Sequence, residues 1–205
     1  MERFNFRRTP ANKWRISGLH LVVLFLRDVV ESLRLYTVDK DYIEYLGKHE
    51  KQILFSEGKD YRKDRKYVGV VLEIHGFNYF APLSSPKESD YIYVNGKKVI
   101  RKSIIPIIRL VSKNNTLLGK IKLNNMIPVP KSCLNDYDVD NESDCKYKSL
   151  VIEEIICIRK NRELIVKNAK ILYRQKTREY TGIKYLDSTV DFNKIETLYK
   201  DYIQR

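Results

Sequence analysis

The sequence predicts an α+β fold in which a strand-rich part precedes a helical C-terminal third. Two observations predict it. From "KYVGVVLEI" to "LLGKIKL", apolar and β-branched segments follow one another with turn signals between them, which is typical of antiparallel strands. After Lys146 the apolar residues recur at helical spacing instead. We therefore expect a small bent sheet or open barrel with helices packed outside it.

The first elements lie in residues 33–83. "LRLYTV" predicts a short strand, and "DKDYIEYLGKHE" predicts a helix with Asp39 as its N-cap. The inner side of this helix carries Tyr42, Ile43 and Leu46. "KYVGVVLEI" and "FNYFAPL" predict two strands, and His75-Gly76 predicts the hairpin turn between them.

The next strands are predicted by turn chemistry. An Asn-Gly pair divides "YIYVNGKKVI", and the polar "SKNNT" divides "SIIPIIRLV" from "LLGKIKL". The acidic "CLNDYDVDNESDC" has Asn141 and Tyr147 where a calcium loop needs glycine and glutamate, so we expect a solvated loop there. Three helices are predicted after it by the spacing of apolar residues. These residues are Ile152, Ile155 and Ile156 in the first helix, Ile165, Ala169 and Leu172 in the second, and Ile195, Leu198, Tyr199 and Tyr202 in the third. The third helix has Asp191 as its predicted N-cap.

The charge balance points to a polyanionic partner. The 205 residues contain 39 Lys+Arg against 26 Asp+Glu, which gives a net charge of +13. They also contain 15 tyrosines, whose rings can stack on unpaired bases, although most tyrosines in strands pack in a core. Three widely spaced cysteines indicate neither a disulfide framework nor a zinc site. The apolar run from Leu19 to Leu26 is too short to span a bilayer. We expect a soluble protein of the reducing cytoplasm.

The sequence lacks the motifs of several kinds of chemistry. None of the three histidines has metal-ligand spacing, and there is no P-loop, no G-x-G-x-x-G and no G-x-S-x-G. We therefore expect no metal and no cofactor. Cations and hydroxyls can suffice for RNA, because its 2′-hydroxyl is a nucleophile already beside the phosphorus and needs only alignment and charge stabilisation.

One short stretch fits that chemistry. In "FAPLSSPK", Pro82 and Pro86 restrict the backbone around Ser84 and Ser85, and Lys87 follows with its charge. The stretch could present hydroxyls, N–H groups and a cation to a phosphate. By itself, a Ser-Ser-Pro turn after a strand is more often an ordinary surface loop.

The wider sequence resembles a known family. The strings "LYTVDKDYIEYL", "YVGVVLEIHGFNYFAPLSSPK" and "LGKIKLNNMIPVP", in that order, resemble the ToxN/AbiQ family of type III toxin-antitoxin endoribonucleases. The resemblance implies a compact, strongly bent antiparallel sheet with flanking helices, similar to the MazF/Kid-like small-barrel toxins. It also implies a cytoplasmic bacterial toxin that acts in phage defence. Such a toxin cleaves RNA without metal and leaves 2′,3′-cyclic phosphate and 5′-hydroxyl ends. It is inhibited by a small repeat-derived RNA antitoxin, which it processes itself and with which it forms a closed protein–RNA assembly.

The resemblance also implies site residues. The family's "PL-T/S-SPK" motif falls on Ser84, Ser85 and Lys87, which would stabilise the scissile phosphate and protonate the leaving oxygen. Its upstream tyrosine and basic residue fall on Tyr61 and Arg65, and a further pocket tyrosine falls on Tyr42. Arg65 departs from a lysine at this place, and because arginine stays protonated its role would be electrostatic.

Several basic residues are candidate RNA contacts, although any one of them is more often a solvated surface residue. They are Arg62, Lys63 and Lys66 in the loop "KDYRKDRK" and Lys160, Lys167 and Lys170 in the helical tail. Residues 1–32 lie outside the resemblance, so we expect an appendage or an over-extended start followed by one endoribonuclease domain over 33–205. The alternatives are a non-catalytic RNA-binding module and a small-barrel toxin that poisons a protein such as a topoisomerase.

Overall fold

In the computed structural model of this chain, residues 33–54 and 65–204 are described. They belong to one compact unit that begins at Leu33. The predicted appendage, residues 1–32, lies outside the described residues, so the domain boundary stays a prediction. The longer elements are β1 Arg34–Val38, α2 Lys40–His49, β2 Tyr67–Ile74, β3 Phe77–Ser84, β4 Tyr91–Val94, β5 Lys97–Ile100, β6 Ile107–Val111, β7 Leu117–Lys122, β8 Ile127–Pro128, β9 Leu134–Asp136, α3 Cys145–Lys160, α4 Arg162–Thr177 and α5 Phe192–Ile203.

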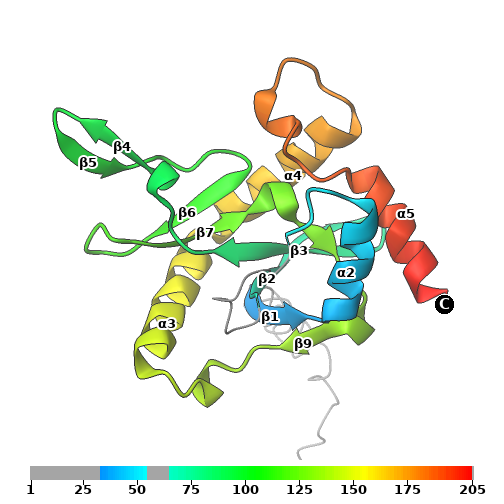
Figure 1. The fold of residues 1–205 in the computed structure, drawn as a ribbon, viewed down its shortest axis with the longest axis horizontal. Helices are drawn as coiled ribbons and strands as arrows, with labels where there is room; N and C mark the ends of the chain where they lie inside the picture. Colours follow the sequence, from blue (N-terminus) through cyan, green and yellow to red (C-terminus); the bar gives the residue numbers. More distant parts are fainter. Residues whose placement is uncertain (1–32, 55–64, 205) are drawn as a thin grey trace, which may run out of the picture. The chain divides into compact units, whose positions relative to one another are not determined.

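The main sheet is antiparallel and has the strand order β6-β7-β3-β2-β1-β9, with β8 added beside β3 (Figure 1). β3 joins its two halves, because it pairs with β2 along most of its length, with β8 at Tyr79 and Phe80, and with β7 at Leu83 and Ser84. A register shift between Val68 and Leu72 marks a bulge in β2, and bulges bend and twist a sheet. The predicted α+β fold with an antiparallel sheet is confirmed.

The main sheet is open. Its path ends at two edge strands, β6 and β9, and no closed barrel forms among residues 33–54 and 65–204. The predicted relation to the MazF/Kid-like toxins stays a prediction.

Both predicted tight turns are confirmed. His75 and Gly76 join β2 to β3 with φ angles of 51° and 80°, and Asn95 and Gly96 join β4 to β5 with φ angles of 50° and 75°. Two consecutive residues with positive φ are what a two-residue hairpin needs to match the twist of its strands, and asparagine and glycine tolerate that region best. The two turns therefore set the registers of both hairpins.

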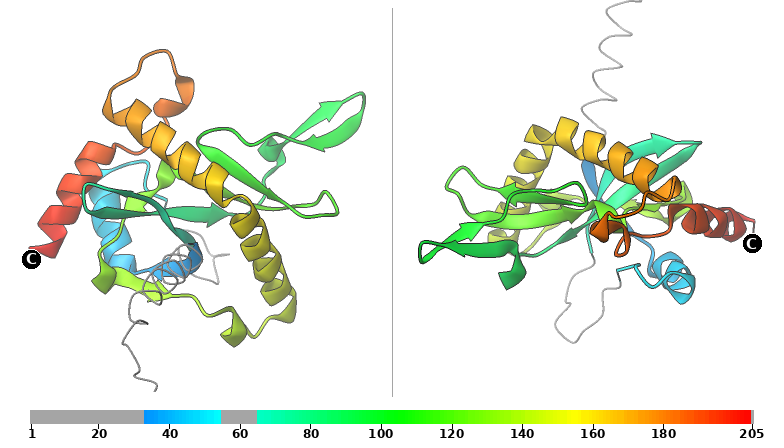
Figure 2. Two further views of the ribbon diagram at one scale, coloured as in Figure 1. Left: turned by 180° about the vertical axis from the view of Figure 1, so that it is seen from behind. Right: turned by 90° about the horizontal axis from the view of Figure 1, so that it is seen from above.

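The helices cover the sheet (Figure 2). α3 packs on β6 and β7, α4 packs on β2, and α5 packs on β8, α4 and α2. Ile165, Ala169 and Leu172 are fully buried on α4, as predicted, and the Asp191 carboxylate accepts a hydrogen bond of 3.1 Å from the Lys194 N–H to cap α5. Within the described part of the chain, every helix is too short or too polar to cross a membrane.

Two details of the sequence prediction are wrong, and a third is confirmed only in part. Ile152 and Ile156, predicted to face the core, are 41% and 54% exposed, because α3 rests on β6 and β7 through the neighbouring face. Asp39 is the N-cap residue of α2, as predicted, but its carboxylate makes no capping bond and accepts a hydrogen bond of 2.7 Å from the Asn135 side chain instead. Asn135 can reach it because β9 pairs with β1, and the acidic segment predicted as a loop therefore begins with a short strand.

An aromatic cluster fastens α4 and α5 to β3. Tyr79 of β3 and Tyr173 of α4 both donate hydrogen bonds, of 2.6 and 2.7 Å, to the Glu196 carboxylate on α5. Phe192 stacks on Tyr173 with 5.3 Å between ring centroids and has no exposed surface. Burying a side chain of this size contributes about 2 kcal/mol, so the cluster keeps β3 in a fixed place.

Candidate active site

The serine motif lies where β3 leaves the sheet. Ser84 is the last residue of β3 and is half-buried, and the next three residues, Ser85, Pro86 and Lys87, are exposed. Pro86 has no N–H to continue the strand pairing, which fits the end of β3 here. A short 3-10 turn, Glu88–Asp90, follows. The turn from Ser84 to Lys87 therefore exposes Ser85 and Lys87 next to the half-buried Ser84.

Strand register places cations beside Ser84. Ser84 lies opposite Lys120 of β7, and Lys120 in turn lies opposite Arg109 of β6. Directly opposed residues in an antiparallel sheet share a face, and residues two apart on one strand do so too. Lys122 of β7 therefore also faces the same side. We call Ser84, Arg109, Lys120 and Lys122 the cationic face.

Asp90 fastens the turn to the cationic face. Its carboxylate accepts a hydrogen bond of 3.0 Å from Arg109 Nη2, another from Lys120 Nζ, and a third of 2.9 Å from the backbone N–H of Lys87. The side chains of all three ionised residues are at most 7% exposed. Burial alone would raise the pKa of Asp90, but the hydrogen bonds from Lys120 and Lys87 and the two positive charges lower it overall. Asp90 therefore stays ionised and keeps the turn in place.

Two further cations complete the site. Arg65, just before β2, donates a hydrogen bond of 3.1 Å to the carbonyl oxygen of Leu83 and so places its guanidinium at the end of β3. Burial lowers the pKa of the half-buried Lys122, and the positive charges of Lys120, Arg65 and Lys87 lower it further. The positive charges in this cluster repel one another, which is why they lower the pKa of Lys122. A bound anion such as phosphate would relieve that repulsion.

A sequence model described as the toxin ToxN of type III toxin-antitoxin systems matches residues 34–200. This chain belongs to the ToxN family. The resemblance read from the sequence is confirmed.

Named relatives agree with this family. The chain is 33% identical over 182 residues to the endoribonuclease AbiQ of Lactococcus lactis subsp. lactis, covering 85% of this chain and 94% of the relative. It is 29% identical over 174 residues to the endoribonuclease ToxN of Pectobacterium atrosepticum, covering 83% and 94%. A solved structure from work on selective toxin inhibition by a non-coding RNA pseudoknot has a TM-score of 0.70 and 26% identity, over 85% of this chain and all of that one.

In this ToxN-family chain the predicted catalytic residues that can be located lie together. Ser84, Ser85 and Lys87 form the turn, and Arg65 reaches the same end of β3. Tyr61, Arg62 and Lys63 lie outside the described residues. Lys160, Lys167 and Lys170 are exposed on α3 and α4, as RNA contacts need to be, and contact with RNA stays a prediction for them.

Two predicted RNA contacts are buried instead. Tyr42 has no exposed surface, and its hydroxyl donates a hydrogen bond of 2.7 Å to the carbonyl oxygen of Pro128 inside the core. Lys66 is 5% exposed, and its ammonium group lies 4.3 Å from the ring centroids of both Tyr137 and Tyr147. Cation–π contact with two rings compensates part of its lost hydration. Both residues therefore support the fold around the site rather than its surface.

The sequence reasoning missed the residues that strand pairing brings to the site: Asp90, Arg109, Lys120 and Lys122. One signal was available. Lys120 and Lys122 alternate with apolar residues in "LLGKIKL", a strand that is otherwise suited to burial, and lysines in such a strand need a partner or a function. Nothing in the sequence indicates that the partner of Lys120 is Asp90.

A buried carboxyl group, that of Glu154 on α3, lies behind the turn. Glu154 is 8% exposed, and a Cβ atom at Gly119 of β7 would lie 2.4 Å from its Oε1 and 3.3 Å from the carbonyl oxygen of Ser84. The missing side chain at Gly119 is therefore what lets the carboxyl group approach β3. Burial raises the pKa of Glu154 from 4.5 to about 7, although the positive charge of Lys66 opposes this.

We expect Glu154→Gln to gain stability over the native chain as the pH rises. The raised pKa means that the fold favours the protonated carboxyl group, so its contribution is complete below pH 4.5 and is lost as the pH rises through 7. The loss amounts to about 3 kcal/mol, which glutamine does not suffer. Urea unfolding at about pH 5 and about pH 8 measures the difference. The exposed neighbour Glu153→Gln is the matched control, and parallel pH curves for the native chain and Glu154→Gln would contradict the expectation.

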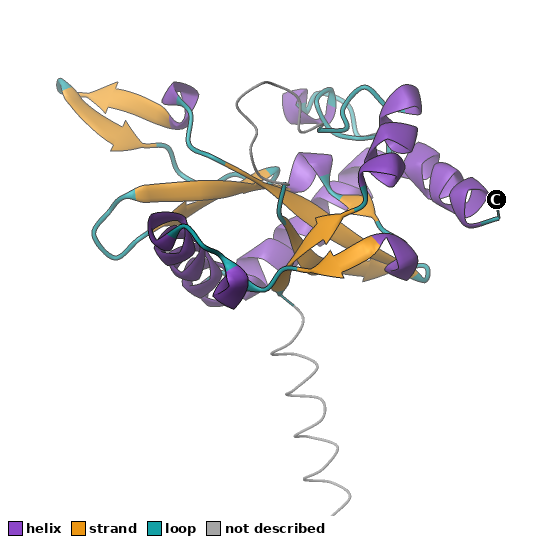
Figure 3. Ribbon diagram, turned by 60° about the horizontal axis from the view of Figure 1, so that its bottom comes forward, coloured by secondary structure: helices purple, strands orange, loops and turns teal. Residues whose placement is uncertain are grey.

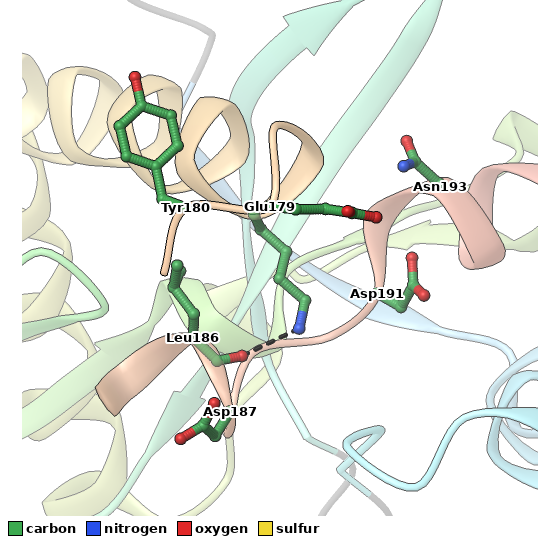
Figure 4. Close-up of a pocket in the computed structure, with 7 residues that line it drawn as sticks. Glu179, Tyr180, Leu186, Asp187, Asp191 and Asn193 are labelled. Carbon is green, nitrogen blue, oxygen red and sulfur yellow. Dashed lines mark hydrogen bonds between the residues drawn. The ribbon is translucent and has the colours of Figure 1, made fainter. Parts of the chain in front are cut away.

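A separate pocket is acidic. It has a volume of about 300 Å³ and lies between the end of α4 and the start of α5 (Figure 4). The carboxylates of Glu179, Asp187 and Asp191 line it, while Lys176 donates a hydrogen bond of 2.9 Å to the carbonyl oxygen of Leu186. Three carboxylates around one pocket repel phosphate. This pocket is therefore not a candidate for binding RNA.

Proposed function

We propose that this chain is a metal-independent endoribonuclease whose active site is the turn from Ser84 to Lys87 together with Arg65 and Lys122. The main support for the proposal is that Ser84 and Ser85 lie beside a cluster of cations at the exposed end of β3. The named relatives, ToxN and AbiQ, are endoribonucleases.

The site can support cleavage by the RNA's own 2′-hydroxyl. The O2′ atom gives its proton to solvent water and bonds to phosphorus, and the bond from phosphorus to O5′ breaks as O5′ takes up a proton from a lysine. The products are a 2′,3′-cyclic phosphate and a 5′-hydroxyl. Ser84 and Ser85 would donate hydrogen bonds to the phosphorane oxygens, while Arg65 and Lys87 stabilise the added negative charge. DNA lacks the nucleophile and would not be cleaved.

Proton transfer falls to a lysine. Arg65 stays protonated at any physiological pH, so it can bind phosphate but cannot exchange a proton. Lys122 has a lowered pKa and lies on the same face as Ser84, which makes its ammonium group a better acid for the leaving O5′ than an ordinary surface lysine. Lys87 is exposed and can neutralise or protonate the same oxygen.

We further propose that a small RNA inhibits the toxin in the bacterial cytoplasm. The solved relative comes from work on inhibition by an RNA pseudoknot, and the net charge of +13 on this chain suits a folded RNA. The antitoxin would be a repeat-derived RNA that the toxin itself trims and that closes with it into a protein–RNA assembly. Phage infection would release the toxin and arrest the infected cell.

RNA cleavage in the presence of a chelator tests the proposal. Protein freed of RNA is incubated with cellular RNA in EDTA, and the ends of the products are identified. We expect cleavage at an undiminished rate, with cyclic-phosphate and 5′-hydroxyl ends. An oligonucleotide with 2′-deoxy sugars throughout serves as the resistant control. Intact RNA would instead support a non-catalytic RNA-binding module, and cell growth arrest without RNA cleavage would indicate a protein target.

A further inference from the structure

The β4–β5 hairpin forms a two-stranded sheet of its own that extends away from the main sheet (Figures 1 and 3). We propose that this hairpin is an RNA-binding arm, in which an unpaired base stacks on Tyr93 while the neighbouring cations contact phosphates. The inference rests on the proposed function, since it names where the RNA lies outside the cleavage site.

The first support is the exposure of an aromatic ring beside a cation. The hairpin register places Tyr93 opposite Lys98 and Tyr91 opposite Ile100, so these four side chains share one face. Tyr93 is 68% exposed, so its ring is open to a stacking base. Lys98 lies 4.2 Å from the Tyr91 ring centroid and is held on this face. A base on Tyr93 would thus have a cation next to it.

The second support is the charge of the hairpin. Residues 87–102 contain five cations and two carboxylates, and neither carboxylate is free: Asp90 is buried with Arg109 and Lys120, and Glu88 pairs with Lys98 at 2.8 Å. The cations that remain are exposed: Lys87, Lys97, Arg101 and Lys102. An exposed ring with exposed cations around it is a combination by which proteins bind single-stranded RNA.

The charge also decides between RNA and a second copy of the chain. The opposite face of the hairpin carries Ile92, Val94 and Val99, which are exposed by 37%, 47% and 42%, together with the exposed Lys97 opposite Val94. Two hairpins paired through these faces would bring two sets of cations together, and such repulsion opposes association. A polyanion is attracted by the same charges. RNA is therefore the occupant that the hairpin fits.

The third support is the connection of the hairpin to the active site. The backbone N–H of Arg101 donates a hydrogen bond of 2.9 Å to the carbonyl oxygen of Asp90, and Arg109 Nη1 donates one of 2.7 Å to the carbonyl oxygen of Lys102. The Asp90 carboxylate also accepts the N–H of Lys87. The base of the arm and the serine turn are thus joined through one residue. RNA that lies along the arm would lead directly to the turn.

Binding of single-stranded RNA tests the arm. The probe is a fluorescein-labelled oligouridylate of about ten nucleotides, near the span of one single-strand binding site. Binding is measured by fluorescence anisotropy in a Ser84→Ala, Ser85→Ala background so that the probe stays intact. We expect Tyr93→Ala to weaken binding about tenfold and Tyr93→Phe to restore it, because stacking needs the ring and not the hydroxyl. Tyr180→Ala is the matched control, since Tyr180 is also exposed, by 47%, but lies at the acidic pocket.

The charges of the arm have a separate readout. Replacing Lys97 and Lys102 together with glutamine should reduce the dependence of log Kd on log salt concentration by about 1.4, because each phosphate contact to a single strand contributes about 0.7. The control pair is Arg178→Gln with Lys184→Gln, both exposed and close in sequence to the acidic pocket.

Three results would overturn the proposal that the β4–β5 hairpin binds RNA. The first is equal affinity of Tyr93→Ala and its parent for the oligouridylate. The second is equal loss of affinity in Tyr93→Ala and Tyr180→Ala. The third is a drop in the sedimentation mass of RNA-free protein on replacing Ile92 and Val99 with threonine, which would make the hairpin an interface between copies. Failure of the proposed function is seen elsewhere, as intact cellular RNA after incubation with the native chain in EDTA.

Discussion

Replacing Ser84 and Ser85 together with alanine is expected to reduce RNA cleavage by about a thousandfold or more. Removal of one oxyanion-stabilising donor typically costs a factor of about 10² to 10³ in rate, and both hydroxyls lie at the same turn. The measurement is the single-turnover rate on a labelled RNA, since it reports the chemical step without product release. The loss should appear in the rate and not in the affinity, because the cations that bind phosphate remain.

The same turn offers a matched control. Ser89 is an exposed serine four residues beyond Ser85, on the far side of Lys87, and Ser89→Ala should cleave at the native rate. Unchanged thermal unfolding of the double variant would show that the fold is intact. If the double variant cleaved RNA at the native rate with its fold intact, the serines would have no part in the chemistry.

The individual replacements separate the two hydroxyls. Ser84 is half-buried, and the strand pairing with Lys120 fixes its backbone, whereas Ser85 is exposed in the turn beyond the strand. A fixed donor stabilises a transition state better than a mobile one, because no reorganisation is needed when charge develops. We therefore expect Ser84→Ala to lose more of the rate than Ser85→Ala.

The sequence predicted those parts of the fold and site that local patterns determine. The His75-Gly76 and Asn95-Gly96 turns were found because two-residue hairpins demand such residues. The serine turn was singled out because prolines and hydroxyls lie within a few residues of one another, but only the family resemblance made it a candidate site. Helix α4 was found because Ile165, Ala169 and Leu172 mark one face. In each case the physical cause lies within a short stretch of chain.

What could not be predicted depends on long-range pairing. Asp90 meets Arg109 and Lys120 only because β6, β7 and the turn after β3 converge, and no local pattern indicates that register. Lys66 was assigned to the RNA surface by residue type, and Tyr42 by the family resemblance, although the helix spacing placed Tyr42 on the inner side. Both have long apolar parts that suit burial when the polar tip finds a partner. Residue type alone therefore does not separate a core tyrosine or lysine from a functional one.

Asp90 is the residue whose loss should damage both stability and activity. We expect Asp90→Asn to lower the free energy of unfolding by about 3 to 5 kcal/mol, because Arg109 and Lys120 would remain buried without a counter-charge. The turn should also lose part of its anchor at Lys87, so cleavage should fall even at temperatures where the variant is folded. Glu88→Gln is the control, because it removes an exposed ion pair with Lys98 that contributes less than about 1 kcal/mol.

Unfolding in acid is an independent test of whether the ionised Asp90 carboxylate stabilises the fold. The fold lowers the pKa of Asp90, so its contribution is present above the ordinary pKa of 3.8 and is lost as the pH falls below that value. The native chain should therefore lose stability more steeply than Asp90→Asn below about pH 4, and the two should converge in strong acid. A second replacement tests whether the uncompensated charges cause the loss of stability. Lys120→Met in the Asp90→Asn background removes one of the two buried positive charges that have lost their carboxylate, and it should recover part of the stability. If Asp90→Asn unfolded at the same urea concentration as the native chain at neutral pH, the buried ion cluster would not be what fixes the serine turn to the sheet.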